Sequence, residues 1–217
     1  MTLKNTENVQ GVACALDHLV MATEDLAAGR AHAQALLDVS LTERGVHEVM
    51  GTHNHLASLD RGAYFEVIAR DPDATPPEFP RWFDLDNFSG PPRLTNWVIN
   101  TPDLEVALAL APADMGRIME FERGPYAWRM VVPETGVLPF DGCFPAIIEW
   151  HSEHPAPALP QHGFTLRRLK LAHPQADALR SALAPFVLGR ENVGIVQAAR
   201  PAIQAEIGTP SGEVWIS

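Results

Sequence analysis

The residues best suited to chemistry in this chain are two glutamates that each interrupt an apolar segment. Glu66 stands within Tyr64–Ile68, and Glu149 stands within Ile147–His151. A buried carboxylate is costly unless it is paired with a cation or binds a metal. The same arrangement at two places in one chain is a stronger signal than either alone. We therefore predict that Glu66 and Glu149 carry acid–base or metal-binding chemistry, with ion-paired structural acids as the alternative.

A third candidate, His18, lies in a segment that returns twice along the chain. The segment Leu16–Leu26 is similar to Leu94–Leu104 and, more weakly, to Leu166–Pro174. Each copy is an apolar, strand-like run that ends in a helix-start signal. A repeat of this kind indicates a supersecondary unit that is used again.

The three copies differ at the position of His18, where the second copy has Asn96 and the third has Arg168. His18 could bind a metal or substrate, or it could be a core histidine with satisfied hydrogen bonds. Arg168 could pair with a buried acid, or it could select an anionic substrate if it faces a cavity.

The elements that position these residues follow the order β-α-β-β-β in the first two units. Apolar periodicity and helix-start residues such as Thr23 and Thr101 mark the boundaries. The first unit is predicted as strands at 15–22, 41–50, 55–59 and 63–69 with a helix at 24–37. The second is predicted as strands at 94–100, 117–123, 127–133 and 146–152 with a helix at 102–112. The third is predicted as a strand at 166–172, a helix at 174–186 and strands at 193–199, 203–207 and 214–216.

The linker between the first two units, Asp71–Pro92, contains six prolines in 22 residues and should lack regular structure. It also carries Phe79, Trp82, Phe83 and Phe88. Because four aromatic side chains should not remain in water, we expect the linker to pack back on the core. It would then be a structural strap or, as the alternative, a lid over a pocket.

Tandem units with a His on the first strand and a Glu on the fourth resemble the vicinal oxygen chelate superfamily, and Leu16–Val20 is the commonest form of that first strand. The stretches Gly51–Asn54 and Tyr64–Pro72 are similar to its glyoxalase-like subfamily. The resemblance implies an α+β fold in which tandem β-α-β-β-β modules form mixed sheets curled into half-barrels around a cavity. The modules would span 12–71 and 92–152 of one domain at 12–152, with a third, partial β-α-β module at 163–217 packed on the same domain.

The resemblance also implies a divalent metal in that cavity, because the superfamily takes ligands from positions that correspond to His18, Glu66, Asn96 and Glu149. An amide such as Asn96 is a poor ligand for first-row metals. The expected metal ligands are therefore His18, Glu66 and Glu149, with Glu66 and Glu149 also as catalytic residues. Zinc, manganese, iron and nickel are all compatible with this set, and a site without metal is the alternative.

Four further residues are expected in the substrate pocket. They are His53, Asn96, Trp97 and Arg168. His53 and His55 lie two residues apart and would share one face of a strand, although a hydrogen-bonding role in a turn at Gly51–Asn54 is the alternative for His53.

The implied function is that of a metal-dependent lyase, isomerase or dioxygenase that acts on a small oxygenated organic substrate through bidentate chelation. The alternative is a non-catalytic protein of the same fold that binds a hydrophobic ligand, as resistance-type relatives do. Close relatives of this fold often dimerise, so a homodimer is also expected.

Composition excludes some partner classes. The net charge is −11, from 16 basic and 27 acidic residues, which opposes binding to nucleic acid. No segment approaches the roughly 18 apolar residues that a membrane span needs. The two cysteines, Cys14 and Cys143, form no metal-binding spacing, so a reducing, cytoplasmic location is expected.

Overall fold

A computed structural model describes residues 11–188 and 193–217; residues 189–192 of the predicted third unit lie outside the described residues. The first unit contains β1 (Val12–Ala22), α1 (Leu26–Leu37), β2 (Gly45–His47), β3 (Thr52–Ser58), the 3-10 turn η1 (Asp60–Gly62) and β4 (Tyr64–Arg70). After the turn η2 (Trp82–Asp84), the second contains β5 (Arg93–Asn100), α2 (Leu104–Leu110), β6 (Arg117–Arg123), β7 (Tyr126–Val132), η3 (Phe140–Gly142) and β8 (Ala146–Trp150). The third, after η4 (Ala156–Ala158), contains β9 (Thr165–His173), α3 (Ala176–Leu183), β10 (Phe186–Leu188), β11 (Val193–Gln197), β12 (Ala202–Thr209) and β13 (Gly212–Ile216).

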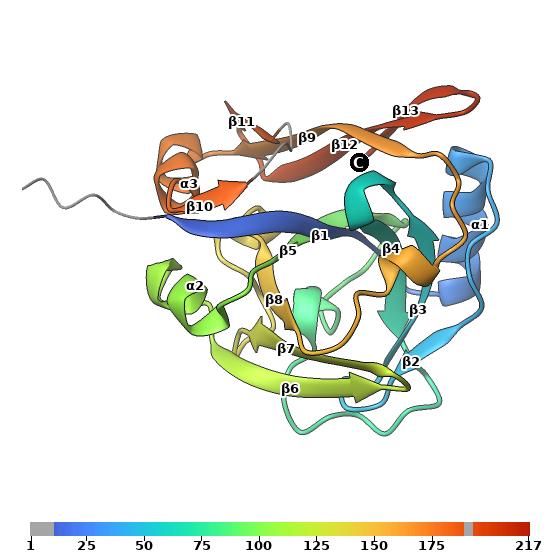
Figure 1. Cartoon of the computed structure of the whole chain (residues 1–217), viewed down its shortest axis with the longest axis horizontal. Coiled ribbons are helices and arrows are strands. Elements are labelled where there is room, and N and C mark those ends of the chain that lie inside the picture. The colour runs from blue at the N-terminus through green and yellow to red at the C-terminus, as the bar shows by residue number, and fades with distance from the viewer. Residues whose placement is uncertain (1–10, 189–192) are drawn as a thin grey trace, which may run out of the picture.

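Within the described residues, nine strands form one curled, mixed sheet in the order β2-β3-β4-β1-β5-β8-β7-β6, with β10 beside the start of β1. The sheet curls around so that β6 and β7 lie opposite β1 and β5 (Figure 1). The predicted α+β fold with curled β-α-β-β-β modules is confirmed. The division of the chain at 12–71, 92–152 and 163–217 stays a prediction.

The central strand of this sheet is β1, whose apolar residues explain its position. Leu19, Val20 and Met21 are completely buried. β1 runs parallel to β4 and antiparallel to β5, so it joins the two units.

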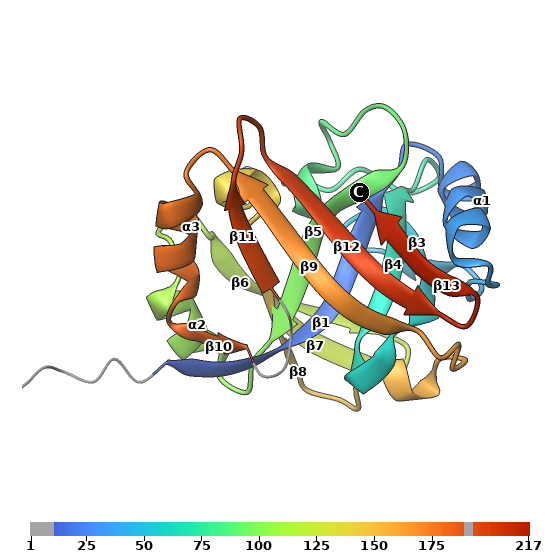
Figure 2. The same ribbon diagram turned by 90° about the horizontal axis from the view of Figure 1, so that it is seen from above.

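A second sheet of four strands, in the order β11-β9-β12-β13, covers the convex side of the first (Figure 2). Its inner face contributes Leu169, Leu171, Ile203 and Ile207 to the core. The third unit therefore encloses the side of β1 and β5 that points away from the curl.

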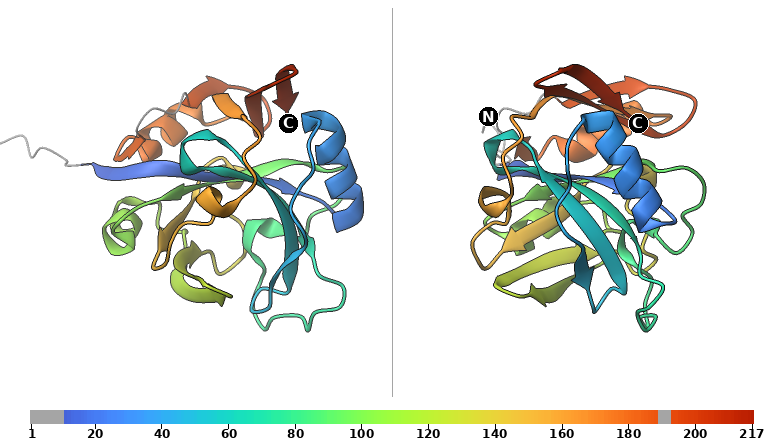
Figure 3. Two further views of the ribbon diagram at one scale, coloured as in Figure 1. Left: turned by 45° about the vertical axis from the view of Figure 1, so that its right-hand side comes forward. Right: turned by 90° about the vertical axis from the view of Figure 1, so that its right-hand side faces the viewer.

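α1 and α2 cover the outside of the curled sheet, and α1 lies against β3 and β4 at one end of the molecule (Figure 3). α3 packs against β9 and β11 of the second sheet. α1 starts two residues later than predicted, because Asp25 rather than Thr23 is the N-cap and accepts from the backbone N–H of Ala28 at 2.7 Å. Asp103 caps α2 in the same way, by accepting from the N–H of Val106 at 3.0 Å. No helix in the described part of the chain is long and apolar enough to cross a membrane.

The predicted turn at Gly51–Asn54 is wrong, because β3 begins at Thr52 and the turn precedes it. The predicted strand at 41–50 is reduced to the short β2. The proline-rich segment packs on the core as expected, since Trp82, Phe83, Leu85 and Phe88 are all buried.

Candidate functional site

The candidate site is built on a pair of adjacent residues in β1, Asp17 and His18. The pairing of β1 with β5 shifts register between Leu16 and His18, so Asp17 is the extra residue of a β-bulge. Bulges redirect side chains and are frequent beside active sites. Here the bulge lets Asp17 and His18 contact each other although neighbouring residues of a regular strand point to opposite faces. The His18 Nδ1–H donates to Asp17 Oδ1 at 2.6 Å.

Asp17 is fully buried and its second oxygen, Oδ2, is saturated with donors. It accepts from Trp150 Nε1 at 2.8 Å, His154 Nε2 at 3.0 Å and Asn100 Nδ2 at 3.0 Å. Burial alone raises the pKa of the Asp17 carboxyl, but hydrogen bonds from His154 and His18 outweigh it and hold the pKa well below its usual range. Asp17 is therefore an anion that fixes the orientation of His18.

Glu66 lies on the other side of His18, on β4. Its Oε2 is 3.5 Å from His18 Nε2, and both side chains are about 95% buried. Its Oε1 accepts from Asn54 Nδ2 at 2.6 Å. Asp17, His18 and Glu66 therefore form one chain of polar groups in the core, with the imidazole between two carboxyl groups.

The polar contacts continue across the curl through three residues that the sequence analysis did not select as site residues. Arg123 on β6 donates from Nη1 to Asn54 Oδ1 at 3.3 Å and to His47 Nε2 at 3.1 Å. Burial lowers the pKa of His47, and the positive charge of Arg123 lowers it further. His47 is therefore neutral, and Arg123 supplies positive charge on the side of the curl opposite β1.

These groups line a small chamber inside the curl. Its volume is about 30 Å³, enough for roughly one water molecule. Tyr64 stacks on His18 with ring centroids 4.4 Å apart, and burial raises the pKa of its phenol well above the usual value. Trp82 and Phe83 from the proline-rich segment close the chamber. Among the described residues, the indole N–H of Trp82 is buried and has no hydrogen-bond partner.

Glu149, the second predicted glutamate, is not in this chamber. In β8 it stands between Ile148 and Trp150, and Trp150 faces the chamber, so Glu149 points outward. There it is bound by Arg129, whose Nε donates to Glu149 Oε2 at 3.0 Å and whose Nη1 pairs with Glu105 of α2 at 2.6 Å. These two acids raise the pKa of the Arg129 guanidinium. Glu149 thus occupies the position expected under the structural, ion-paired alternative.

The strand register explains the difference between the two glutamates. In the first unit, Val20 of β1 pairs with Glu66 of β4. In the second unit, the residue equivalent to Val20 is Val98 of β5, and it pairs with Ala146 of β8. The counterpart of Glu66 is therefore Ala146, three residues before Glu149. A shift by an odd number of residues moves a side chain to the opposite face of a sheet.

The structure also separates the residues predicted for the substrate pocket. Trp97 is fully buried on the convex side, where its Nε1 donates to the carbonyl of Cys143 at 3.0 Å. Arg168 is exposed on the second sheet beside Glu206. Of the residues predicted for the pocket, only Asn96 shares the concave face with His18 and Glu66. Val20 of β1 pairs with Glu66 of β4 on one side and with Asn96 of β5 on the other, so these side chains point to the same face of the sheet.

His53 lies on the outer face of β3, beneath the start of α1. Arg44 Nε donates to His53 Nδ1 at 2.9 Å, and Asp71 lies 3.7 Å away. Burial lowers the pKa of both His53 and His55. Both line one outer pocket, which confirms the shared face, while Asn54 between them faces the chamber.

The donor set does not fit the resident metal that the superfamily implies. The described residues contain no group of three His, Cys, Asp or Glu side chains close enough to hold an ion. His18 and Glu66 are two donors, whereas a catalytic zinc site uses three protein ligands. The positions of the second unit that are equivalent to His18 and Glu66 by strand register are occupied by Asn96 and Ala146. The buried pair of His18 and Glu66 is suited to proton transfer to and from a bound molecule.

Comparison with known proteins identifies the family of this chain. The family model described as the glyoxalase-like domain matches residues 16–187, which is most of the chain. The chain belongs to this family. The glyoxalase-like family is part of the vicinal oxygen chelate superfamily, so the predicted relationship is confirmed.

Several solved structures are similar to this chain at low sequence identity. A hypothetical protein from Staphylococcus aureus has a TM-score of 0.55 and 12% identity, with 93% of this chain and 84% of that chain covered. Methylmalonyl-CoA epimerase from Mycobacterium tuberculosis has a TM-score of 0.43 and 15% identity, covering 72% of this chain and 97% of that chain. The Streptomyces coelicolor epimerase with 2-nitronate-propionyl-CoA has a TM-score of 0.42 and 15% identity, with 64% and 96% covered. No curated protein matches the chain.

Proposed function

We propose that this glyoxalase-like protein is an enzyme that moves a proton on a small oxygenated organic molecule, with Glu66 as the proton carrier. The observation that carries the proposal is the buried chain Asp17–His18–Glu66, in which two carboxyl groups flank one imidazole. A positioned pair of this kind can take a proton from carbon and deliver one to oxygen. Isomerases and lyases that act beside a carbonyl group need this chemistry.

Each residue has a role in that reaction. Glu66, oriented by Asn54, would take the proton from the carbon next to the carbonyl. His18, held by the anionic Asp17, would donate to the carbonyl oxygen from Nε2. Arg123 would stabilise the negative charge that develops on the substrate, because a fixed charge in a site closed to water acts strongly.

A substrate needs more room than the chamber offers, so Trp82 and Phe83 would have to move aside. Phe83 separates the chamber from a larger pocket next to it, because it lines both. Trp82, with its unpaired buried N–H, is held less firmly than a fully bonded side chain would be. The proposal therefore requires the proline-rich segment to act as a lid over the chamber, which is the alternative to a structural strap.

The second candidate function is a non-catalytic protein that binds a hydrophobic ligand. The aromatic walls formed by Trp82, Trp128 and Trp150 favour it. The interior polar chain favours the enzyme, since a simple apolar binding site would not need three buried ionisable groups. A homodimer and a cytoplasmic location remain predictions from the sequence.

Hydrogen exchange at carbon tests the proposal. Pyruvate, dihydroxyacetone and the hemithioacetal of methylglyoxal would be incubated with the protein in D₂O, and loss of the C–H signals followed by NMR. Glu66→Gln should lower the exchange rate by about 10²–10⁴-fold, the usual contribution of a general base. Glu149→Gln is the matched control and should keep the wild-type rate. Full activity in Glu66→Gln would reject the assignment, and no exchange by the wild type on any of the three would favour the binding protein.

A further inference from the structure

A pocket of about 610 Å³ lies beside the chamber, between the proline-rich segment and the second sheet. We call it the strap pocket; its lining comes from residues 83–96, 137–142 and 201–204, with Ser217. A volume of this size is typical of small-molecule sites. Neither the proposed proton transfer nor the chamber uses its polar groups.

Asn96 gives the first indication that a ligand belongs there. The side chain is 4% exposed and lines the pocket, and within the described residues its amide has no hydrogen-bond partner. The neighbouring Thr95 hydroxyl is also buried without a partner among those residues. Buried polar groups in proteins are almost always bonded, so the Thr95 hydroxyl, next to the unpaired Asn96 amide, indicates a missing partner at this pocket.

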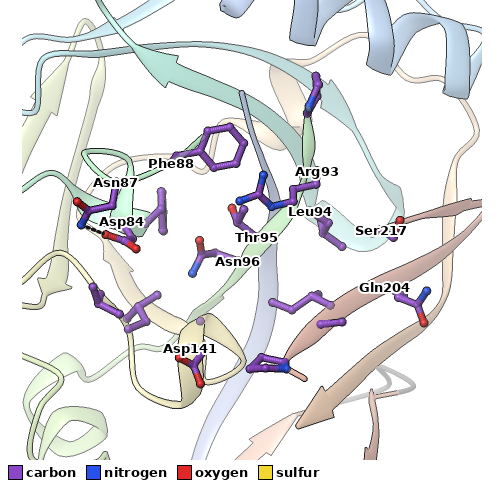
Figure 4. Close-up of a pocket in the computed structure, with 18 of the residues that line it drawn as sticks. Asp84, Asn87, Phe88, Arg93, Leu94, Thr95, Asn96, Asp141, Gln204 and Ser217 are labelled. Carbon is purple, nitrogen blue, oxygen red and sulfur yellow. Dashed lines mark hydrogen bonds between the residues drawn. The ribbon is translucent and has the colours of Figure 1, made fainter. Parts of the chain in front are cut away.

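Two turns that each hold a Phe-Asp pair in the left-handed backbone region bring carboxylates to this pocket. Phe83 and Asp84 have φ values of 59° and 53°, and Phe140 and Asp141 have 54° and 53°. Figure 4 shows Asn96 near the centre of the view, with Asp84 to its left, Asp141 below it, and Phe88 and Arg93 above it. Each carboxylate has one oxygen engaged, Asp84 with Asn87 at 2.7 Å and Asp141 with His173 at 3.3 Å. The other oxygen of each can accept from a ligand.

We propose that the strap pocket binds a small primary amine with an apolar body. A primary ammonium has three N–H donors and no acceptor. Asp84, Asp141 and the carbonyl oxygen of Asn96 supply three acceptors in the lining of this pocket.

The rest of the lining suits the body of such an amine and limits its charge. The apolar wall consists of Phe83, Phe88, Leu94, Leu138 and Ile203. Arg93 lies over the Phe88 ring at 4.2 Å and donates to the carbonyl of Ser89 at 2.8 Å. Its positive charge would repel a second ammonium, so the pocket should prefer a monoamine.

Binding of two probes that differ in one group tests this inference. Isothermal titration calorimetry would compare 2-phenylethylamine with the uncharged 2-phenylethanol on the full chain at neutral pH. We expect saturable binding of the amine and binding of the alcohol that is about tenfold weaker or undetectable, since the charged hydrogen bonds are lost. Asp84→Asn and Asp141→Asn should each weaken amine binding by about tenfold.

The controls separate this site from surface charge and from the proposed reaction. Asp177→Asn, at an acid that is 98% exposed on α3, should leave amine binding unchanged. Glu66→Gln should also leave it unchanged, so the pocket can be verified even if the proposed proton transfer fails. Absence of saturable amine binding, equal binding of the alcohol, or equal binding in Asp84→Asn, Asp141→Asn and Asp177→Asn would each overturn the inference. A folded Asn96→Ala variant that binds the amine as well as the wild type would remove Asn96 from the site.

Discussion

Glu66 and Ala146 occupy equivalent positions in the two units of the curled sheet. Glu66 lies beside Val20 of the first unit's opening strand, and Ala146 lies beside Val98 of the second unit's. The carboxylate that the first unit brings to the chamber is therefore missing from the second. Together with Asn96 at the position equivalent to His18, this difference gives the chamber a single His–Glu pair instead of two symmetric donor sets.

Gly142 should be the least replaceable of three glycines that differ in their surroundings. It has φ +83°, and an added Cβ would lie 2.8 Å from both Asn96 Nδ2 and the carbonyl oxygen of Thr95. Gly142→Ala should therefore lower the free energy of unfolding by more than about 2 kcal/mol, from left-handed strain and steric overlap together.

Two control glycines separate these causes. Gly124 has φ +57° with open space around it, so Gly124→Ala should cost about 1 kcal/mol from strain alone. Gly194 has open space and an ordinary φ, so Gly194→Ala should be neutral or slightly stabilising. Urea unfolding of the three variants gives the order, and a Gly142→Ala cost no larger than that of Gly124→Ala would contradict the close contact with Asn96.

Stability should fall as the pH drops from about 7 to 5. Burial lowers the pKa of His47, His53 and His55 in the folded protein, whereas an unfolded histidine has a pKa of about 6.5. Below that pH the unfolded chain binds protons that the folded chain does not, so the free energy of unfolding decreases. The slope is at most about 1.4 kcal/mol per pH unit for each histidine.

Urea unfolding across this pH range measures the slope. The double variant His53→Gln/His55→Gln should show a shallower dependence than the wild type, because two of the titrating groups are gone. An unchanged slope in that variant would show that these two histidines titrate alike in the folded and unfolded states.

Both cysteine thiols should resist modification in the folded protein. Burial raises the pKa of Cys14 and of Cys143 to about 11, and both side chains are buried. At pH 8 little of either thiol is ionised to the reactive thiolate, and a thiol reagent in solution cannot reach the buried sulfur atoms. Ellman's reagent should label neither cysteine in native protein and both in guanidinium chloride; rapid labelling of native protein would contradict the burial of β1 or of the segment after η3.

The sequence was sufficient for the fold and for the proximity of His18 and Glu66. The repeated strand and helix-start signals predicted the tandem units, and His18 with Glu66 was correctly expected to meet. Glu149 was wrongly predicted to share a site with Glu66, because both faces of β8 are covered, one by α2 and one by the chamber. Ala146–Ile148 is fully buried and therefore shows no alternation from which the facing of Glu149 could be read.

Other residues were beyond prediction because their roles depend on long-range packing. Asn54, Arg123 and His154 reach the site from three elements far apart in the chain. For Asn54 a usable signal existed: it stands between His53 and His55 in a strand, so it had to face the side opposite them. For Asp17, the bulge that turns it toward His18 is visible only in the strand register.

Metal binding tests the central claim, that the second unit lacks its donors at Asn96 and Ala146. Wild type, Asn96→His/Ala146→Glu and Glu149→Gln would be purified without an affinity tag and titrated with Zn²⁺, with metal content measured by mass spectrometry. We expect one equivalent of tightly bound zinc in the double variant, because four donors would then surround one centre. We expect no stoichiometric zinc in the wild type or in Glu149→Gln. One equivalent of zinc in the wild type that disappears in Glu149→Gln would contradict the account, since it would place Glu149, and not the position of Ala146, at the site.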